Sequence, residues 1–384
     1  MKVMTVVGTR PELIRLSRVL ERLDRSVEHI LVHTGQNYDF ELNEIFFNDL
    51  GIRKPDHFLA VDTSTLGRAL GDILARTEEV LRAERPDAFM ILGDTNSALA
   101  AIMARRLRVP VYHLEAGNRC FDFNVPEEIN RRLVDHVSDF NLVYTEHARR
   151  HLLAEGLQHR RVHLIGSPMA EVLDHYADRI AASTILDELQ LKAGGYFIAS
   201  IHREENVDDP ANLRRLLASF EALHARFGKP VVVSTHPRTR ARLEAMESAG
   251  RSSDALQFLK PFGFFDYNAL QKKAFCAISD SGTIAEEAAI LGFPAVTPRN
   301  AMERPEALDT GSVILSGLTP EGIVEGVSTI TRQFAESGPP PCPHDYTPLN
   351  TSQRVVNLMV GTARLSNAWW GVHMDPLGRG DGQA

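Results

Sequence analysis

Residues 111–136 read VYHLEAGNRCFDFNVPEEINRRLVDH, and this stretch holds the repeating unit from which the rest of the fold can be predicted. The apolar run at 109–112 is typical of a buried strand. His113 and Glu115 follow it, and Gly117 then allows the chain to turn. The stretch therefore begins as a strand that delivers a carboxylate at its end.

A helix is predicted to follow the turn. Pro126 fits the first position of a helix, and the carboxylate of Glu127 favours the positive end of the helix dipole. Glu115 and Glu127 would then lie at the carboxyl edge of a parallel sheet, where ligands bind in open α/β folds. Alternatively, Glu127 only stabilises the helix start and Glu115 is a loop acid, and the stretch alone leaves both interpretations open.

The same rhythm of strand, turn and helix runs through the first half of the chain. Short apolar runs alternate there with segments of helical periodicity. We expect strands at 3–7, 29–33, 88–92, 139–143 and 162–165, and helices at 13–23, 39–50, 65–82 and about 95–107. This alternation predicts an α/β fold in which helices cover both faces of a parallel sheet.

A second cycle of strands and helices follows the polar stretch at 177–195. We expect strands at 196–201, 230–234, 256–259, 276–278, 295–297 and 312–315, and a helix at 284–291. Four prolines at 339–343 cannot continue a helix or a sheet. The predicted division is therefore a first α/β domain at 1–167, a second at 168–338, a proline-rich linker with a C-terminal helix (about 352–365) at 339–370, and a flexible tail at 371–384.

The composition excludes several classes of protein. The chain has 384 residues and a formal net charge of −8, whereas nucleic-acid binding requires a basic surface. No apolar run approaches the roughly 20 residues of a membrane span. Three cysteines without metal-type spacing, and no signal peptide before the first strand, predict a cytoplasmic protein.

Two further strand ends in the first half carry polar motifs. Gly8-Thr9-Arg10-Pro11-Glu12 turns from a strand into a helix, so its amides and Arg10 could meet a phosphate, although Arg10 could also be a surface residue. In Gly93-Asp94-Thr95, Asp94 either caps the next helix or leaves that role to Thr95 or Asn96 and faces the ligand edge. No G-x-G-x-x-G follows a strand, which argues against an NAD-dependent protein.

Strand ends in the second half are also polar. His202-Arg203 follows the first strand, and His236-Pro237-Arg238 follows the second. Ser279-Asp280-Ser281-Gly282-Thr283 precedes the helix at 284–291, where small hydroxylated residues leave amides available for a diphosphate. Glu286 and Glu287 lie one turn into that helix, within reach of a ribose diol. A simple capping segment would explain the serines but not the charged residues at 299–306.

Together and in this order, the motifs resemble those of the non-hydrolysing UDP-N-acetylglucosamine 2-epimerase family. The matching residues are Gly8-Thr9-Arg10-Pro11-Glu12, Gly93-Asp94-Thr95, Glu115-Ala116-Gly117, Pro126-Glu127-Glu128, His202-Arg203, Asp280-Ser281-Gly282 with Glu286-Glu287, and Glu303-Arg304-Pro305-Glu306. The resemblance covers about 2–335. It implies a glycosyltransferase-B-like fold of two Rossmann-like domains facing each other across a cleft, with the C-terminal helix crossing back to the first domain. It also implies a homodimer without cofactor or metal.

The resemblance further implies a reaction and the residues that perform it. C2 of a UDP-N-acetylhexosamine would be inverted by anti elimination of UDP and re-addition through a 2-acetamidoglycal. The catalytic residues would be Asp94, Glu115, Glu127 and His202. The predicted contacts to the UDP-sugar are Arg10, Arg119, Arg131, His236, Arg238, Tyr267, Ser281, Gly282, Thr283, Glu287 and Arg304, with Tyr267 where the family places an aromatic ring against uracil.

Departures from the family pattern bear on the subtype. Gln36-Asn37-Tyr38 and Glu204 differ from the family at its allosteric sugar-nucleotide site. The segment at 118–122 most resembles the branch that converts UDP-2-acetamido-2,6-dideoxy-L-talose to UDP-N-acetyl-L-fucosamine for capsule and O-antigen. Epimerisation of UDP-GlcNAc to UDP-ManNAc is the alternative. A glycosyltransferase of the same fold, a hydrolysing epimerase and a non-catalytic sugar-nucleotide-binding regulator are more distant ones.

Overall fold

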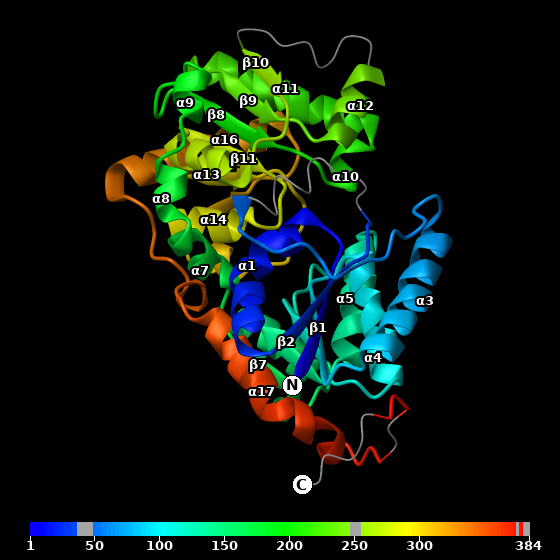
Figure 1. Cartoon of the computed structure of the whole chain (residues 1–384). Helices are drawn as coiled ribbons and strands as arrows, with labels where there is room; N and C mark the ends of the chain where they lie inside the picture. Colours follow the sequence, from blue (N-terminus) through cyan, green and yellow to red (C-terminus); the bar gives the residue numbers. More distant parts are fainter. Residues whose placement is uncertain (37–48, 246–254, 374–375, 379–384) are drawn as a thin grey trace. The chain divides into compact units, whose positions relative to one another are not determined.

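The computed structural model describes residues 1–36, 49–245, 255–373 and 376–378 (Figure 1). The chain divides into two compact units, here called the first unit (Met1–Val172 with Pro348–Ala384) and the second unit (Leu173–Thr347). The two units meet at 172/173, five residues after the predicted boundary at 167/168. The helix α7 (Pro168–His175) starts at the predicted boundary and contains the observed one. Among the described residues, no helix is long and apolar enough to cross a membrane.

The first unit is built on one parallel sheet of seven strands in the order β3-β2-β1-β4-β5-β6-β7. The chain therefore builds outward from β1 to β3 and then returns to place β4 on the other side of β1. The strands are β1 (Lys2–Val7), β2 (Glu28–His33), β3 (His57–Phe58), β4 (Ala88–Leu92), β5 (Val111–Leu114), β6 (Phe140–Val143) and β7 (Val162–Leu164). The reversal between β1 and β4 is the switch point at which open α/β sheets bind ligands.

Helices cover both faces of this sheet because alternate strand residues are apolar on both sides. Val3 and Val7 pack with α1 and α17, whereas Met4 and Val6 pack with α3, α4 and α5. The helical segments are α1 (Arg10–Ser26), α3 (Leu66–Glu84), η1 (Asn96–Ala100), α4 (Ala101–Arg106), α5 (Pro126–Val137), α6 (Glu146–Ala154), η2 (His159–Arg161) and α17 (Thr351–Trp369).

The second unit repeats the plan with six parallel strands in the order β10-β9-β8-β11-β12-β13. Its switch point lies between β8 and β11. The strands are β8 (Phe197–Ser200), β9 (Val231–Ser234), β10 (Leu256–Leu259), β11 (Cys276–Ser279), β12 (Ala295–Thr297) and β13 (Val313–Leu315). The helical segments are α8 (Ala177–Ala181), α9 (Ile185–Glu188), α10 (Glu204–Val207), α11 (Pro210–Phe227), α12 (Pro237–Ala245), α13 (Phe264–Lys273), α14 (Ile284–Leu291), α15 (Glu306–Asp309), α16 (Pro320–Ser337) and η3 (His344–Tyr346).

Three local predictions need correction. β5 starts at Val111 and includes His113, which is buried inside the strand and does not follow it. The helix predicted at 95–107 is a 3₁₀ turn followed by α4, and the Thr95 hydroxyl donates to Glu12 instead of capping the segment. Leu377, in the tail predicted to be flexible, is buried against the apolar core on the α3 side of the sheet. Most of the helix predicted at 39–50 lies outside the described residues.

Candidate active site

The first unit gathers three of the predicted motifs at its switch point. Gly8 follows β1, Asp94 follows β4 and Glu115 follows β5, and these strands are neighbours in the sheet. The ends of β4 and β5 are also joined directly, because the Gly93 amide donates to the Leu114 carbonyl at 2.9 Å. The carboxyl groups of Asp94 and Glu115 therefore start from adjacent strand ends.

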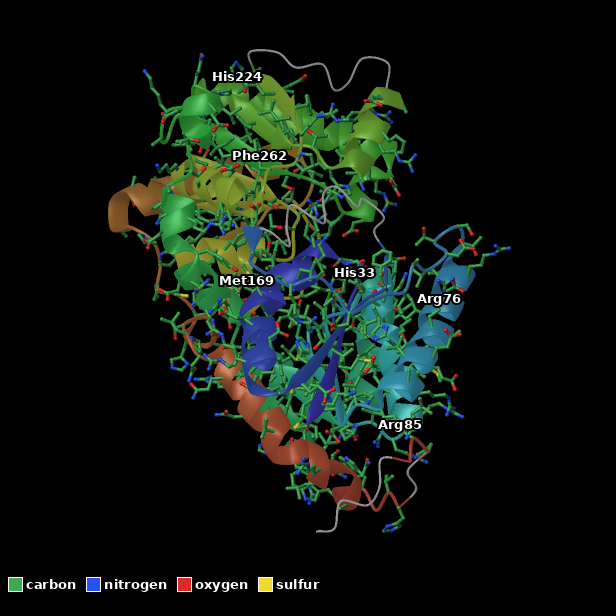
Figure 2. The ribbon with its side chains drawn as sticks, viewed as in Figure 1. His33, Arg76, Arg85, Met169, His224 and Phe262 are labelled. Carbon is green, nitrogen blue, oxygen red and sulfur yellow. The ribbon has the colours of Figure 1, made fainter. Side chains whose placement is uncertain are left out.

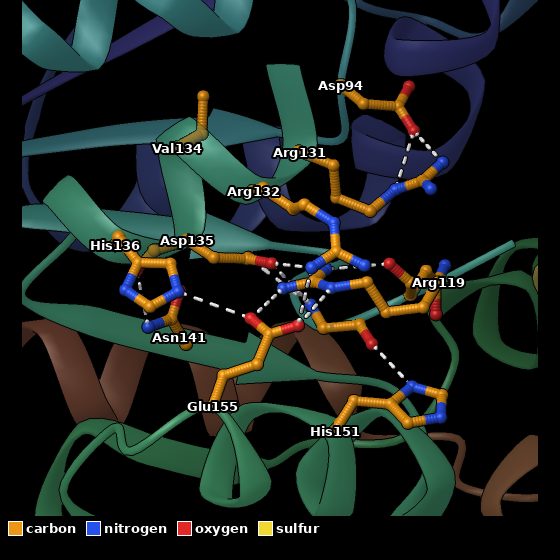
Figure 3. Close-up of polar contacts among 12 residues, drawn as sticks. Asp94, Arg119, Arg131, Arg132, Val134, Asp135, His136, Asn141, His151 and Glu155 are labelled. Atoms are coloured by element: carbon orange, nitrogen blue, oxygen red, sulfur yellow. Dashed lines mark hydrogen bonds and ion pairs between the residues drawn. The ribbon is translucent and has the colours of Figure 1, made fainter. Parts of the chain in front are cut away.

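Asp94 is held by helix α5. Its carboxylate accepts from Nε of Arg131 at 3.0 Å and from a second guanidinium nitrogen of the same residue (Figure 3). Asn130, the preceding residue of α5, donates to the Asp94 backbone carbonyl at 3.0 Å. Since one fifth of the Asp94 side chain is exposed, the carboxylate is oriented and still reachable. Arg131, predicted to contact substrate, is largely buried and lies beside this catalytic candidate.

Glu115 has a strained backbone and a buried partner. Its φ of 65° lies in the left-handed region, which costs a non-glycine residue roughly 1 to 2 kcal/mol. Its carboxylate forms an ion pair with Arg15 of α1, and both side chains are more than nine-tenths buried. Strain of this kind is often retained at functional sites. The structure therefore places Glu115 as an acid that is anchored by a buried ion pair at the end of β5.

The two adjacent acids at the start of α5 have different environments. Glu127 is exposed on the first helical turn, as expected for a group that could approach a ligand. Glu128 is fully buried and accepts from Arg131 at 2.9 Å and from Arg132 at 3.0 Å. Only Glu127 of this pair is therefore a candidate for proton transfer.

Arg119 is buried in a network of charges, contrary to its predicted role in contacting substrate. Its side chain is 0% exposed and donates to Asp135 at 2.7 Å and to both oxygens of Glu155 at 2.8 and 2.7 Å (Figure 3). Hydrogen bonds from Arg119 lower the pKa of Glu155 to about 2. Arg119 therefore holds the loop after β5, and its buried guanidinium is not positioned to contact a substrate.

Asp135 is the centre of that network. Its buried carboxylate accepts from the Gly117 amide at 3.2 Å and faces Nδ1 of His113 at 2.9 Å. Burial alone would raise the pKa of Asp135, but His113 and Arg119 lower it below its usual range. The other ring nitrogen of His113 lies 2.8 Å from the Gly93 carbonyl. One carboxylate on α5 thus connects the ends of β4 and β5.

Glu12 was not among the predicted site residues, although it is central to the first motif. Its carboxyl group accepts from the Gly8 amide at 2.6 Å and from the Thr95 hydroxyl at 2.6 Å. Burial raises its pKa to about 7. The Thr9-x-x-Glu12 spacing is that of a capping box and was the available signal. Arg10, the first residue of α1, is half-buried next to this turn.

The end of β2 lies against the same region. His33 is buried and labelled in Figure 2, and burial lowers its pKa to about 4. The side-chain oxygen of Gln36 accepts from the Ser97 amide at 3.3 Å and from its hydroxyl at 2.9 Å. The Gln36 side chain is therefore hydrogen-bonded within the first unit. Asn37 and Tyr38 lie outside the described residues.

The second unit also gathers its motifs at its switch point. His202 follows β8 and Asp280 follows β11, and Nδ1 of His202 lies 3.0 Å from the Asp280 carboxylate. Ser281, Gly282 and Thr283 form a turn in which the Ser281 hydroxyl accepts from the Thr283 amide at 3.3 Å. This turn leads into α14, whose N-terminus can stabilise an anion.

Two further predicted contacts lie on the helices behind this turn. Glu287 is largely buried on α14 and accepts from Gln271 at 2.9 Å. Tyr267 on α13 is half-buried, and burial followed by the charge of Glu287 raises the pKa of its hydroxyl. The hydroxyl end of Tyr267 therefore faces the interior of the second unit.

Of the remaining predicted contacts, the two arginines pair with acids, and His236 lies near His202. Arg238 donates through Nε to Asp208 at 3.1 Å, and the ring of His236 lies 6.4 Å from that of His202. Arg304 is 97% buried and pairs with Glu286 at 3.2 Å, so we assign it to packing and no longer to substrate contact. Within the described ranges, no cluster of three His, Cys, Asp or Glu side chains has the arrangement of a metal site.

Two parallel α/β sheets, each with a polar switch point, define a protein of two Rossmann-like units in the glycosyltransferase-B-like class. A glycotransferase of kitacinnamycin shares this fold with a TM-score of 0.56 at 11% identity. The chain belongs to the UDP-N-acetylglucosamine 2-epimerase family, which matches residues 21–360. It is therefore an epimerase, and epimerases are isomerases.

Relatives within the family are similar over nearly their whole length. The UDP-N-acetylglucosamine 2-epimerase of Methanocaldococcus jannaschii is 34% identical over 87% of this chain and 93% of its own. A UDP-2,3-diacetamido-2,3-dideoxy-D-glucuronate 2-epimerase of Pseudomonas aeruginosa is 35% identical over 86% and 92%. The structure of UDP-N-acetylglucosamine 2-epimerase from Rickettsia bellii has a TM-score of 0.89 at 45% identity, covering 96% and 99%. The M. jannaschii enzyme solved with UDP-GlcNAc and UDP has a TM-score of 0.87 at 30% identity, covering 94% and 100%.

Proposed function

We propose that this chain inverts C2 of a UDP-N-acetylhexosamine without hydrolysing it, by eliminating UDP and adding it back. The observation that supports this most directly is the pair of carboxylates at adjacent strand ends. Asp94 forms an ion pair with Arg131, and Glu115 forms one with Arg15. The relatives' names, and the UDP-GlcNAc and UDP in the M. jannaschii structure, support the substrate class. Two oriented acids are what a proton removal and a proton delivery require.

The chemistry explains why the leaving group must help. The proton on C2 is not next to a carbonyl and is barely acidic, so its removal is costly unless the C1–O bond to UDP breaks as well. One carboxylate takes the proton, the C2–H electrons form the C1=C2 bond of a 2-acetamidoglycal, and UDP leaves with the C1–O electrons. A carboxylic acid then protonates the opposite face of C2 and UDP returns to C1.

We assign these two proton transfers to the group Asp94, Glu115 and Glu127. General acids and bases typically contribute about 10²- to 10⁴-fold each. The charge that develops on the diphosphate would be stabilised by Arg10, by His202 and by the turn that begins at Ser281.

For the sugar, we propose UDP-2-acetamido-2,6-dideoxy-L-talose, giving UDP-N-acetyl-L-fucosamine for capsule or O-antigen assembly. The support is the segment at 118–122 beside Glu115, which resembles that branch. UDP-GlcNAc, converted to UDP-ManNAc, is the competing substrate, and the names of the M. jannaschii and R. bellii relatives support it equally.

Product analysis in D₂O tests the reaction. Incubation with each UDP-sugar should give the intact C2 epimer with deuterium at C2, because the new proton comes from solvent. An epimer without deuterium would contradict the elimination. Free sugar with UDP would indicate a hydrolysing epimerase, and transfer to an added acceptor would indicate a glycosyltransferase.

The ratio of kcat/KM for the two UDP-sugars, measured without any added activator, tests the subtype. The 6-deoxy sugar should be turned over faster. The expected preference is at most about 10²-fold, since an apolar pocket discriminates only weakly against an added hydroxyl. Faster turnover of UDP-GlcNAc would refute the subtype and leave the 2-epimerase proposal intact.

We also propose that the protein is a cytoplasmic homodimer. The apolar side chains Phe123, Ile129 and Leu133 are exposed at and beside α5, which supports a covered face there. None of the three cysteines, all of which the structure describes, forms a disulfide, as in proteins of a reducing compartment. Light scattering should give twice the chain mass, and Leu133→Glu should shift it towards the monomer. A monomeric wild type would contradict the dimer.

A further inference from the structure

The end of β11 contributes a buried carboxylate directly behind the predicted catalytic histidine. Asp280 is 0% exposed, and its oxygens lie 3.0 Å from Nδ1 of His202 and 3.1 Å from the His202 backbone amide. The Arg203 amide donates to it at 3.1 Å and the Asn206 side chain at 2.9 Å. Every one of these partners comes from the segment after β8, on the other side of the switch point.

These contacts determine how the imidazole is protonated. Burial alone would raise the pKa of Asp280, but the charge of His202 and the surrounding hydrogen bonds lower it to about 2, so the group is a carboxylate at neutral pH. A carboxylate only accepts hydrogen bonds, so Nδ1 of His202 must carry a proton. Nε2 is then the nitrogen that can act on a ligand, and 41% of the side chain is exposed.

The neighbouring basic side chains have contacts other than this carboxylate. The guanidinium of Arg203 donates to the Asp280 backbone carbonyl at 3.0 Å and pairs with Glu303 at 3.1 Å. The ring of His236 is centred 6.4 Å from that of His202. Asp280 is thus the carboxylate that fixes the orientation of the His202 ring.

We propose that Asp280 is a positioning residue that holds His202 as the Nδ1–H tautomer and directs Nε2 towards the leaving diphosphate. The identity of the ligand as a diphosphate rests on the proposed function. The orientation and tautomer of His202 rest on the contacts of Asp280 alone. A carboxylate behind a catalytic histidine orients the ring and stabilises it when the ring becomes charged, as in Ser-His-Asp hydrolases. Asp280 thus acts through His202 and needs no contact with substrate.

The first test needs no substrate, and a variant serves only to assign a signal. Two-bond ¹H–¹⁵N correlation spectra of [¹⁵N]histidine-labelled protein, with His202→Ala used to assign the signal, report the tautomer at pH values where the ring is neutral. We expect Nδ1–H for His202. An Nε2–H tautomer in the wild type would overturn the proposal even if epimerase activity is found. Because this readout is independent of turnover, it separates the proposal from a failure of the proposed function.

The second test is a double-mutant cycle on kcat. Asp280→Asn should lower kcat by roughly 10²-fold or more while UDP binds within about threefold of wild type, and the exposed Asp187→Asn should change neither. In the His202→Ala background, Asp280→Asn should cost less than about threefold more, because its partner is already absent. Equal losses in both backgrounds, or a loss of UDP binding that matches the loss of kcat, would show that Asp280 only supports the fold and would overturn the proposal.

Discussion

At the scale of single residues, Glu12 should make the stability of the first unit depend on pH. Its carboxyl pKa is raised from 4.5 to about 7, so the folded protein holds this proton more tightly than the unfolded chain. The stabilisation is complete below about pH 4.5 and is lost as the pH rises through 7. The free energy of unfolding of the wild type should therefore fall relative to that of Glu12→Gln between pH 5 and pH 8, by up to about 3 kcal/mol. Urea titrations measure this difference. If the free energies of unfolding of the wild type and of Glu12→Gln change with pH in parallel, the raised pKa of Glu12 is contradicted.

The carboxylates at the ends of β4 and β5 give a second prediction at this scale. Asp94→Asn and Glu115→Gln keep the shape of each side chain but cannot transfer a proton, so kcat should fall about 10²- to 10⁴-fold with little change in UDP affinity. The exposed Glu79→Gln on α3 is the matched control. Steady-state turnover and UDP titration measure both quantities. Acid variants within tenfold of wild type would show that these are not the reacting groups.

Sequence patterns predicted the position of site residues along the chain better than their partners. That Glu115 follows a strand can be predicted from local periodicity. The burial of Arg119 cannot, because its partners Asp135 and Glu155 lie 16 and 36 residues away and are brought to it by α5 and α6. The local sequence around an arginine does not distinguish one that forms a buried ion pair from one that binds a phosphate.

At the scale of elements, the turn after β5 depends on Gly117. Its φ is +80°, and an added Cβ would lie 2.5 Å from the Ala148 carbonyl oxygen. Gly156 has a similar φ of +88° with no atom within 4 Å of that position. Both alanine variants should lose roughly 1 kcal/mol to backbone strain, and Gly117→Ala should lose at least about 1 kcal/mol more because of the clash. Equal urea midpoints for the two variants would contradict this packing.

Elements were predictable where the apolar pattern is strong. The bounds of β4, β10, β12 and α14 are those expected from the sequence, since each is a short, mostly apolar segment with a glycine or a proline within two residues after its end. The 3₁₀ turn before α4 was not predicted, and the hydrogen bond at its start, from Thr95 to Glu12, joins residues that lie 83 positions apart in the chain. The late start of β5 reflects Pro110, which lacks the amide that a ladder requires.

At the scale of the whole molecule, α17 completes the first unit. Val355, Val356 and Met359 are buried against α1 and the first sheet. Met359→Ala should therefore destabilise that unit by about 2 to 5 kcal/mol, whereas the half-exposed Val360→Ala on the same helix should have little effect. Hydrogen exchange should accelerate in β1 and α1 and stay unchanged in β8 and β9. Faster exchange in the second unit alone would contradict the assignment of α17 to the first unit.

The order of these segments along the chain has a consequence for synthesis. The first unit consists of residues 1–172 and 348–384, so the whole second unit is translated before α17 leaves the ribosome. At about 5 to 20 residues per second, this takes roughly 9 to 35 seconds. During that time the apolar side of α1, including Leu16 and Leu20, lacks the helix that covers it. The nascent chain should therefore be most vulnerable to aggregation and most dependent on chaperones while its second half is being made.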